Sequence, residues 1–224
     1  MGSEQTILPT FEYDQCLAGG FRLPARMTAL PLPEGKLALV SPIPLTDSMV
    51  AELAALGEVT HILAPNLFHH LYVGAALKRY PQAQLLAPAA LRKKCPELPL
   101  ARVLEEGLPE ALTATLTLVH IAGAPKLDEF VVYHKPSRTL VVADLVFNMT
   151  QPQGWVAGLL LRLVGAHGKL AQSRVVRFLL KDKQAARAST EQLLALPFEN
   201  LVVAHGEVIQ GQAKQRLMAV LQGV

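Results

Sequence analysis

The chain has 224 residues and a formal net charge of +3, with 51% hydrophobic and 17% charged residues. This composition is too apolar for a disordered protein, and the length suffices to bury a full core, so we expect a single folded domain over residues 1–224. The small charge disfavours nucleic acid as a partner. The one basic cluster, Arg92-Lys93-Lys94, is interpreted as a solvated helix end.

Cysteine usage and the apolar runs bear on cellular location. Cys16 and Cys95 lie far apart and match no C-x-x-C pattern, which favours a reducing, cytoplasmic compartment. The N-terminus lacks the basic start and apolar stretch of a secretory signal. The longest apolar run, at 155–161, is about half of the roughly 20 residues that cross a bilayer, and Arg162 follows it. We therefore expect no membrane partner, and a buried or lid-like helix at this run.

The first half of the chain begins with predicted strands, after which predicted helices and strands alternate. Short apolar runs between prolines and glycines predict leading antiparallel strands at 21–23, 26–30 and 36–40. Thr46 to Ser48 can cap a helix over 49–56 that ends at Gly57. Strand, helix, strand and helix are then expected at 59–63, 69–79, 84–87 and 89–94. This alternation is typical of a sheet with helices packed on it.

The second half returns to β structure. Strands are expected at 114–120, 130–134 and 139–144, the last two forming a hairpin around the Pro136 turn. The segment 150–197 is expected to be mostly helical, with its last helix starting at Ser189-Thr190-Glu191. A strand at 200–204 and a helix at 210–222 complete the chain. The pattern indicates an α/β protein.

Polar side chains gather where three predicted strands end. Asn66, His69 and His70 follow the strand at 59–63, Asp144 ends the hairpin and His205 follows the last strand. Loops at strand carboxyl ends converge, and imidazole and carboxylate are preferred ligands of divalent transition metals. Each residue also has a plainer interpretation as a helix cap, turn residue or loop histidine. Together they predict a metal site.

Other polar residues form a second tier. His120 could reach the same edge, and Asn66 and Glu129 could support the ligands from behind. The remaining histidines, interpreted as structural or surface residues, are His61, His134 and His167. The sequence contains no G-x-x-x-x-G-K-[ST], G-x-G-x-x-G or G-x-S-x-G motif, which argues against a nucleotide-binding protein or a serine hydrolase.

The order of elements resembles the metallo-β-lactamase superfamily, with a strand leading into a His-rich loop, a hairpin ending in Asp144 and a late strand ending in His205-Gly206. Several stretches between residues 20 and 222 also resemble the DUF4336 branch of that superfamily. They are Arg26-Met27-Thr28, Ser41-Pro42-Ile43-Pro44-Leu45-Thr46, Ala64-Pro65-Asn66-Leu67-Phe68-His69-His70, Tyr80-Pro81-Gln82-Ala83 and Ala204-His205-Gly206. The resemblance implies an αββα sandwich of α/β class (α+β in some schemes), with the metal site at one edge.

The superfamily signature H-x-H-x-D-H is incomplete in this chain. If His69-His70 replaces its D-H pair, Pro65 and Leu67 stand in place of its first two histidines. The third histidine of that first metal position, expected near residues 123–125, is also missing. If the register shifts by one residue, Asn66 and Phe68 stand in place of those two histidines and His70 replaces the Asp. The residues retained in either register are His70, Asp144 and His205, and they amount to one metal position.

This ligand set implies a hydrolase that acts on a small-molecule substrate with one divalent metal, zinc first, with iron or manganese as alternatives. The metal-binding residues would be His69, His70, Asp144 and His205. Asp144 either binds the metal or orients the attacking water, and His69 either binds the metal or acts as a base. The alternative is a non-catalytic protein that kept the fold for a binding or scaffold role, because half of the signature is lost.

Overall fold

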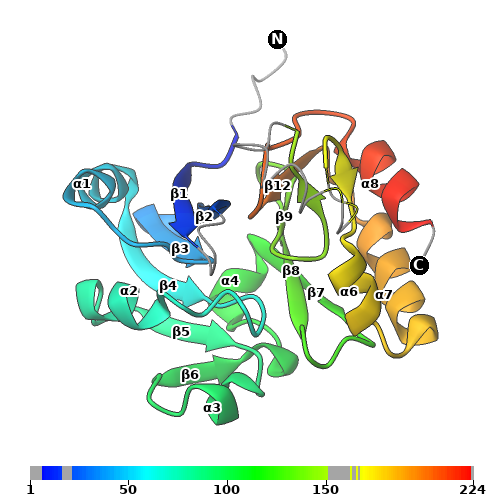
Figure 1. Ribbon diagram of the computed structural model, residues 1–224. Coiled ribbons are helices and arrows are strands. Elements are labelled where there is room, and N and C mark those ends of the chain that lie inside the picture. Colours follow the sequence, from blue (N-terminus) through cyan, green and yellow to red (C-terminus); the bar gives the residue numbers. More distant parts are fainter. Residues whose placement is uncertain (1–6, 17–21, 151–161, 163–164, 166, 223–224) are drawn as a thin grey trace.

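The computed structural model describes residues 7–16, 22–150, 162, 165 and 167–222. Figure 1 shows two β-sheets between two groups of helices, with α1 and α2 outside one sheet and α6, α7 and α8 outside the other. The six-stranded sheet has the order β1-β2-β3-β4-β5-β6, and the four-stranded sheet has the order β12-β9-β8-β7. The order of layers is that of the expected αββα sandwich.

The six-stranded sheet begins antiparallel and becomes parallel from β3 onward. In the four-stranded sheet β7, β8 and β9 are antiparallel, while β12 lies parallel to β9. The strands are β1 Thr10–Cys16, β2 Arg22–Leu32, β3 Lys36–Val40, β4 Glu58–Leu63, β5 Gln84–Ala87, β6 Leu100–Val103, β7 Leu116–Ile121, β8 Glu129–His134, β9 Thr139–Val142, β10 Phe147–Asn148, β11 Leu170–Ala171 and β12 Asn200–Val203. The α-helices are α1 Asp47–Leu56, α2 Val73–Arg79, α3 Leu91–Lys94, α4 Glu110–Thr113, α6 Arg174–Leu179, α7 Lys183–Ala195 and α8 Ala213–Leu221.

Three apolar layers hold this arrangement together, because successive strand residues face opposite sides of a sheet. In β3, Leu39 packs in the layer that contains Leu53 of α1. The next residue, Val40, lies in the layer between the sheets together with Val132 of β8. A third layer fills the space between the four-stranded sheet and helices α7 and α8. The binary pattern of the strands therefore dictates four stacked layers.

The helix after β4 begins later than the sequence predicts. We expected it at 69–79, but α2 starts at Val73. The side-chain Oδ1 of Asn66 accepts hydrogen bonds from the backbone N–H groups of Phe68 and His69, at 2.9 and 2.8 Å. This Asx turn folds the chain back before the helix can begin. His69 and His70 consequently lie in a turn and not on a helix.

The helical prediction for residues 150–197 needs correction. A short strand, β11, precedes the helices, and α7 begins at Lys183, where the Asp182 side chain accepts from the backbone N–H of Ala185. Ser189 and Thr190 lie inside α7, and their hydroxyls donate to the backbone carbonyls one turn earlier. Such hydroxyl bonds let these residues sit within a helix as well as at its cap. The apolar run at 155–161 lies outside the described residues.

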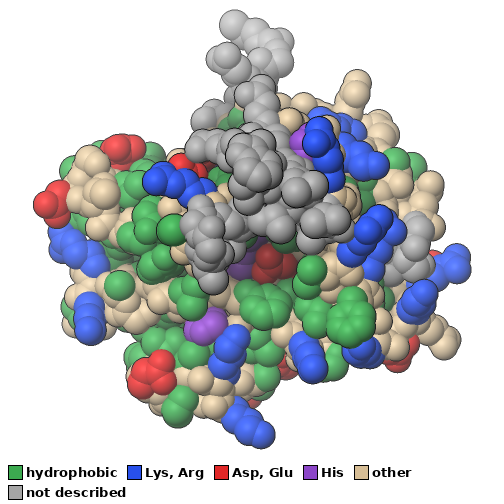
Figure 2. All heavy atoms as spheres, in the orientation of Figure 1, with side chains coloured by type: hydrophobic (Ala, Val, Ile, Leu, Met, Phe, Trp, Pro, Cys, Tyr) green, Lys and Arg blue, Asp and Glu red, His purple; other side chains and the backbone are tan. Residues whose placement is uncertain are grey.

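Two predictions about the surface are confirmed. The basic cluster is the solvated end of α3, where Arg92, Lys93 and Lys94 are all exposed. No disulfide joins the two cysteines, of which Cys16 is exposed and Cys95 is buried. On the face shown in Figure 2, lysines and arginines are scattered among hydrophobic side chains. Within the described ranges, none of the helices combines the length and the apolar character that a bilayer crossing requires.

Candidate metal centre

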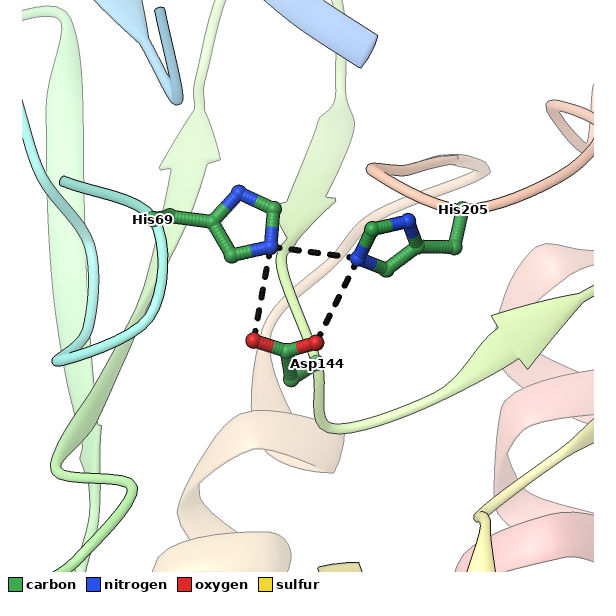
Figure 3. A group of neighbouring side chains, drawn as sticks. All are labelled: His69, Asp144 and His205. Atoms are coloured by element: carbon green, nitrogen blue, oxygen red, sulfur yellow. Dashed lines mark hydrogen bonds and ion pairs between the residues drawn. The ribbon is translucent and has the colours of Figure 1, made fainter. Parts of the chain in front are cut away.

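Three of the predicted ligands converge at one edge of the sandwich. Figure 3 shows His69, Asp144 and His205 pointing toward one another from three separate loops, which follow β4, β9 and β12. The Nε2 atoms of the two histidines are 3.2 Å apart. Oδ2 of Asp144 lies 3.3 Å from Nε2 of His69, and Oδ1 lies 3.4 Å from Nε2 of His205. Strand order thus brings together residues that are 136 positions apart in the chain.

The distances among these ligand atoms fit a metal ion. Two ligand atoms that are each about 2.0 Å from a tetrahedral zinc lie about 3.3 Å apart. The two imidazole nitrogens are 3.2 Å apart, close to that value, and they lie 3.3 and 3.4 Å from different carboxylate oxygens of Asp144. One ligand atom from each of the three residues lies within 4.8 Å of the other two. Two imidazoles and a carboxylate are also an ordinary donor set for zinc, iron or manganese. The residues present therefore fit one divalent metal and leave a fourth coordination position open.

His205 is held so that its Nε2 lone pair faces the site. Its Nδ1 lies 2.8 Å from the carbonyl oxygen of Pro24, and because a carbonyl only accepts, Nδ1 carries the proton. The neutral ring then has its free lone pair on Nε2, as metal binding requires. Phe147 stacks on the same ring at 5.0 Å between centroids and an interplanar angle of 10°. The ring therefore has both its tautomer and its plane fixed.

Arg26 fixes the loop that carries His205. Its guanidinium, only 7% exposed, donates to the carbonyl of Val203 at 2.6 Å and to the carbonyl of Gly206, and it pairs with Glu12. These bonds join the second strand of one sheet to the end of the last strand of the other. In the sequence, Arg26 stood out only as part of a stretch that resembles a family, and no local signal indicated which groups its side chain binds.

Asp144 rests on a buried polar network. Asn66 donates from Nδ2 to Oδ2 of Asp144 at 2.7 Å and to Oε2 of Glu129 at 3.2 Å. Glu129, fully buried, also accepts from the backbone N–H groups of Ala143 and Asp144, both at 2.9 Å. Asn66 and Glu129, both second-tier predictions, therefore lie directly behind the carboxylate and orient it.

The two buried carboxyl groups have pKa values that move in opposite directions. Burial, together with the charge of Asp144, raises the pKa of Glu129 to about 7. Burial also disfavours ionised Asp144, but the charges and hydrogen bonds of His69 and His205 in their protonated forms outweigh it and hold the pKa of Asp144 below its usual value. Near neutral pH the charge therefore resides on Asp144, the carboxylate that faces the two imidazoles.

The geometry reverses the expected ranking of the two adjacent histidines. His70, retained in either register, does not join the group formed by His69, Asp144 and His205. Its Nδ1 is buried without a hydrogen-bond partner, and burial and Lys94 lower its pKa. The Asx turn of Asn66 directs His69, and not its neighbour, toward the other two ligands.

His120 lies apart from this centre. It pairs with Asp128 at 2.9 Å, stacks on Phe130 and is 41% exposed. The structure therefore does not support its second-tier place near the ligands. His134 is buried and has a hydrogen-bond partner at each ring nitrogen, Ser137 and the carbonyl of Pro31, as expected of a structural histidine.

A pocket of about 290 Å³ opens onto the metal centre. Its walls include His69, Asp144 and His205, and they are otherwise mostly apolar. The described side chains that supply this apolar surface are Leu23, Ala25, Pro42, Ile43, Phe68 and Leu71. A few convergent polar groups in an apolar recess are typical of a small-molecule site.

Comparison with known proteins identifies the fold. Neither a protein-family model nor a curated protein sequence matches the chain. The metallo-β-lactamase from Pontibacter korlensis is similar in structure with a TM-score of 0.62 and 14% identity, over 96% of this chain and 94% of that one. The metallo-β-lactamase FIM-1 from Pseudomonas aeruginosa, solved in a mono-zinc form, gives 0.61 and 12% over 96% and 90%.

A flavodiiron protein shares the same architecture. The Flv1 flavodiiron core from Synechocystis, solved after metal soaking, has a TM-score of 0.64 and 15% identity, over 96% of this chain but only 57% of that one. Identities at this level establish the architecture alone. With two facing sheets, helices outside them and a His/Asp/His group at one edge, the chain has the metallo-β-lactamase fold.

Proposed function

We propose that this protein is a metal-dependent hydrolase that binds a single divalent metal through His69, Asp144 and His205. The observation that carries the proposal is the convergence of two imidazole nitrogens, 3.2 Å apart, on the carboxylate of Asp144, with one ligand atom from each residue within 4.8 Å of the others. Zinc fits this donor set best, and iron and manganese are the alternatives. FIM-1, which was solved in a mono-zinc form, is consistent with a single zinc in this fold. The flavodiiron core is consistent with iron as the alternative.

We also propose a branch of the superfamily, a cellular location and a substrate class for this protein. The stretches Arg26-Met27-Thr28 and Ala204-His205-Gly206 support a place in the DUF4336 branch. They meet in space, because Arg26 donates to the carbonyl of Gly206. We propose a cytoplasmic protein with a small-molecule substrate, since no disulfide joins Cys16 to Cys95 and the pocket is small.

The reaction consistent with this site is hydrolysis of an acyl or phosphoryl bond. A bound divalent metal supplies Lewis-acid chemistry and lowers the pKa of water to about 7. The anionic Asp144 either binds that metal or accepts the proton of the attacking water, and the Asn66 amide keeps its carboxylate in place. The water oxygen forms the new bond to the carbonyl carbon or phosphorus, the bond to the leaving group breaks, and a proton passes to the leaving group. The apolar pocket walls limit competing water.

The test is metal analysis of protein purified without chelator, followed by assays on esters, thioesters, lactams and phosphodiesters. We expect one metal per chain in the wild type and in His120→Ala, whose side chain lies outside the centre. His69→Ala and His205→Ala should each lose the metal and the hydrolysis together. A wild-type protein that takes up no zinc, iron or manganese on titration would refute the proposal. Retained metal without turnover would favour the binding or scaffold alternative.

A further inference from the structure

The pocket at the metal centre borders a second, larger space. This groove of about 940 Å³ lies between α2, β5 and the segment that follows α3. His70 and Leu71 line both spaces. Farther along the border, Lys94 lines the first space and its neighbour Cys95 lines the second. The two spaces therefore border each other along two separate segments of the chain.

The groove is apolar along most of its length. Its described lining residues include only two charged side chains, Lys78 and Glu97. The apolar ones come from α2 and from the strands and turns beside it, and they are Leu71, Gly74, Ala75, Leu77, Pro81, Ala83, Leu85, Cys95, Leu98, Pro99 and Ala101. A surface of this kind offers burial to hydrocarbon and few partners to polar groups.

Exposed hydrophobic side chains mark the junction of the two spaces. Six large hydrophobic residues among the described ones are exposed, and two of these line the metal-centre pocket. They are Phe68, 45% exposed, and Leu71, 60% exposed. Leu71 also lines the groove, so the most exposed apolar side chain of this region stands where a ligand would pass from one space to the other. Such a position favours an apolar ligand that covers it.

We propose that the substrate is an acyl ester or thioester with a long, unbranched hydrocarbon chain, a class that rests on the proposed hydrolase function. The acyl carbonyl lies at the metal centre, and the chain crosses Leu71 into the groove beside α2. Two spaces in series suit a ligand that is long and flexible, whereas a compact substrate would use the 290 Å³ pocket alone. Hydrolysis breaks the bond from the carbonyl carbon to the alcohol or thiol, and water supplies the carboxylate oxygen and the proton of the leaving group.

Two measurements test the groove, and one of them does not need catalysis. The first is the binding of a fluorescent fatty acid to metal-free protein. The second is hydrolysis of acetyl, butyryl, hexanoyl and octanoyl esters by the metal-loaded protein. The variant is Ala75→Phe, because Ala75 is exposed on α2 and lines the groove but not the metal-centre pocket. The matched control is Ala55→Phe, the same change at an exposed position of α1 that lines neither space.

We expect kcat/KM of the wild type to rise about two- to fourfold for each methylene added. Ala75→Phe should abolish this dependence and weaken fatty-acid binding about tenfold or more, while acetyl ester hydrolysis is unchanged. Ala55→Phe should behave as the wild type. Equal chain-length dependence in all three proteins, or no fatty-acid binding by the wild type, would overturn the proposal. Fatty-acid binding that Ala75→Phe abolishes, without hydrolysis of any ester, would support the groove and refute the hydrolase.

Discussion

Replacing Asn66 by Asp tests whether the network behind the metal centre is as constrained as its contacts indicate. The change keeps the shape of the side chain but exchanges the amide donor for a carboxylate oxygen. That atom would then lie where Nδ2 is now, 2.7 Å from Oδ2 of Asp144 and 3.2 Å from Oε2 of Glu129. We expect the variant to be strongly destabilised, and increasingly so as the pH rises.

The magnitude follows from the two lost hydrogen bonds and the added charge. The bond to ionised Asp144 contributes about 1.5–3 kcal/mol, and the bond to Glu129, which is largely protonated below about pH 7, contributes about 0.5–1.5 kcal/mol. Their loss therefore lowers the free energy of unfolding by about 2–4.5 kcal/mol. A third carboxyl beside Asp144 and Glu129 can remain in the fold by binding a proton, which raises its folded pKa. Since the folded state then holds more protons than the unfolded state, stability falls with rising pH, by about 1.4 kcal/mol per unit for one proton.

Urea unfolding of metal-free protein, followed by circular dichroism at about pH 5 and about pH 8, measures both quantities. The matched control is Asn200→Asp, because Asn200 is also buried but its side chain donates to the carbonyl of Ser137 and accepts from the backbone N–H of Gly211. Asn66→Asp should cost more than the control and should have the steeper pH dependence. Equal losses of free energy and parallel pH profiles would refute the reasoning.

Three further predictions concern the same centre. Arg26→Met should lower the free energy of unfolding by about 3–5 kcal/mol and weaken zinc binding about 10-fold or more. The control Glu12→Gln should change stability by only about 0–1 kcal/mol, because Glu12 is 65% exposed. Urea titration measures the stability, and zinc competition measures the affinity. The raised pKa of Glu129 means that metal-free wild type loses stability as the pH rises from 4.5 to about 7, and Glu129→Gln should lack that loss in unfolding titrations. Zinc at about 100 times its Kd should stabilise the wild type by about 2.7 kcal/mol but leave His205→Ala unchanged; calorimetry that shows equal shifts would contradict the site.

The fold was predictable where the signals are local. Strands at 36–40 and 84–87 were expected with the bounds that β3 and β5 have, because each is a short apolar run stopped by a proline-containing turn. The hairpin of β8 and β9 was also expected, and the pairing confirms it. These segments are buried on both faces, so their apolar runs are continuous and conspicuous.

The strands at the two edges of the six-stranded sheet were missed. In β1 exposed polar residues alternate with partly buried ones, and β6 has four residues, only one of them buried. β1 is an edge strand paired over seven residues with β2, and that pairing is invisible in the strand's own composition. Edge strands carry weaker apolar patterns because one side faces solvent.

The candidate site was likewise predictable in part. Strand ends brought Asp144, His205 and the adjacent histidines to one edge, because loops that follow neighbouring strands converge. Whether His69 or His70 faces the other ligands depends on one side chain, Asn66, which turns the backbone through two hydrogen bonds. An Asn side chain commonly accepts hydrogen bonds from backbone N–H groups two and three residues later, which makes an Asx turn. This signal was available in the sequence.

The positions that the superfamily signature reserves for a first metal are occupied here by packing. Pro65 accepts at its carbonyl from the backbone N–H of Phe130 at 2.8 Å, and Leu67 packs in the apolar layer outside the six-stranded sheet. Near the expected third histidine, Gly123 has φ +82°, and a Cβ there would lie 2.1 Å from the carbonyl oxygen of Asp182. A side chain at Gly123 would therefore require the start of α7 to move. Because backbone and apolar contacts fill these places, they support the proposal that the three remaining ligands hold one metal rather than two.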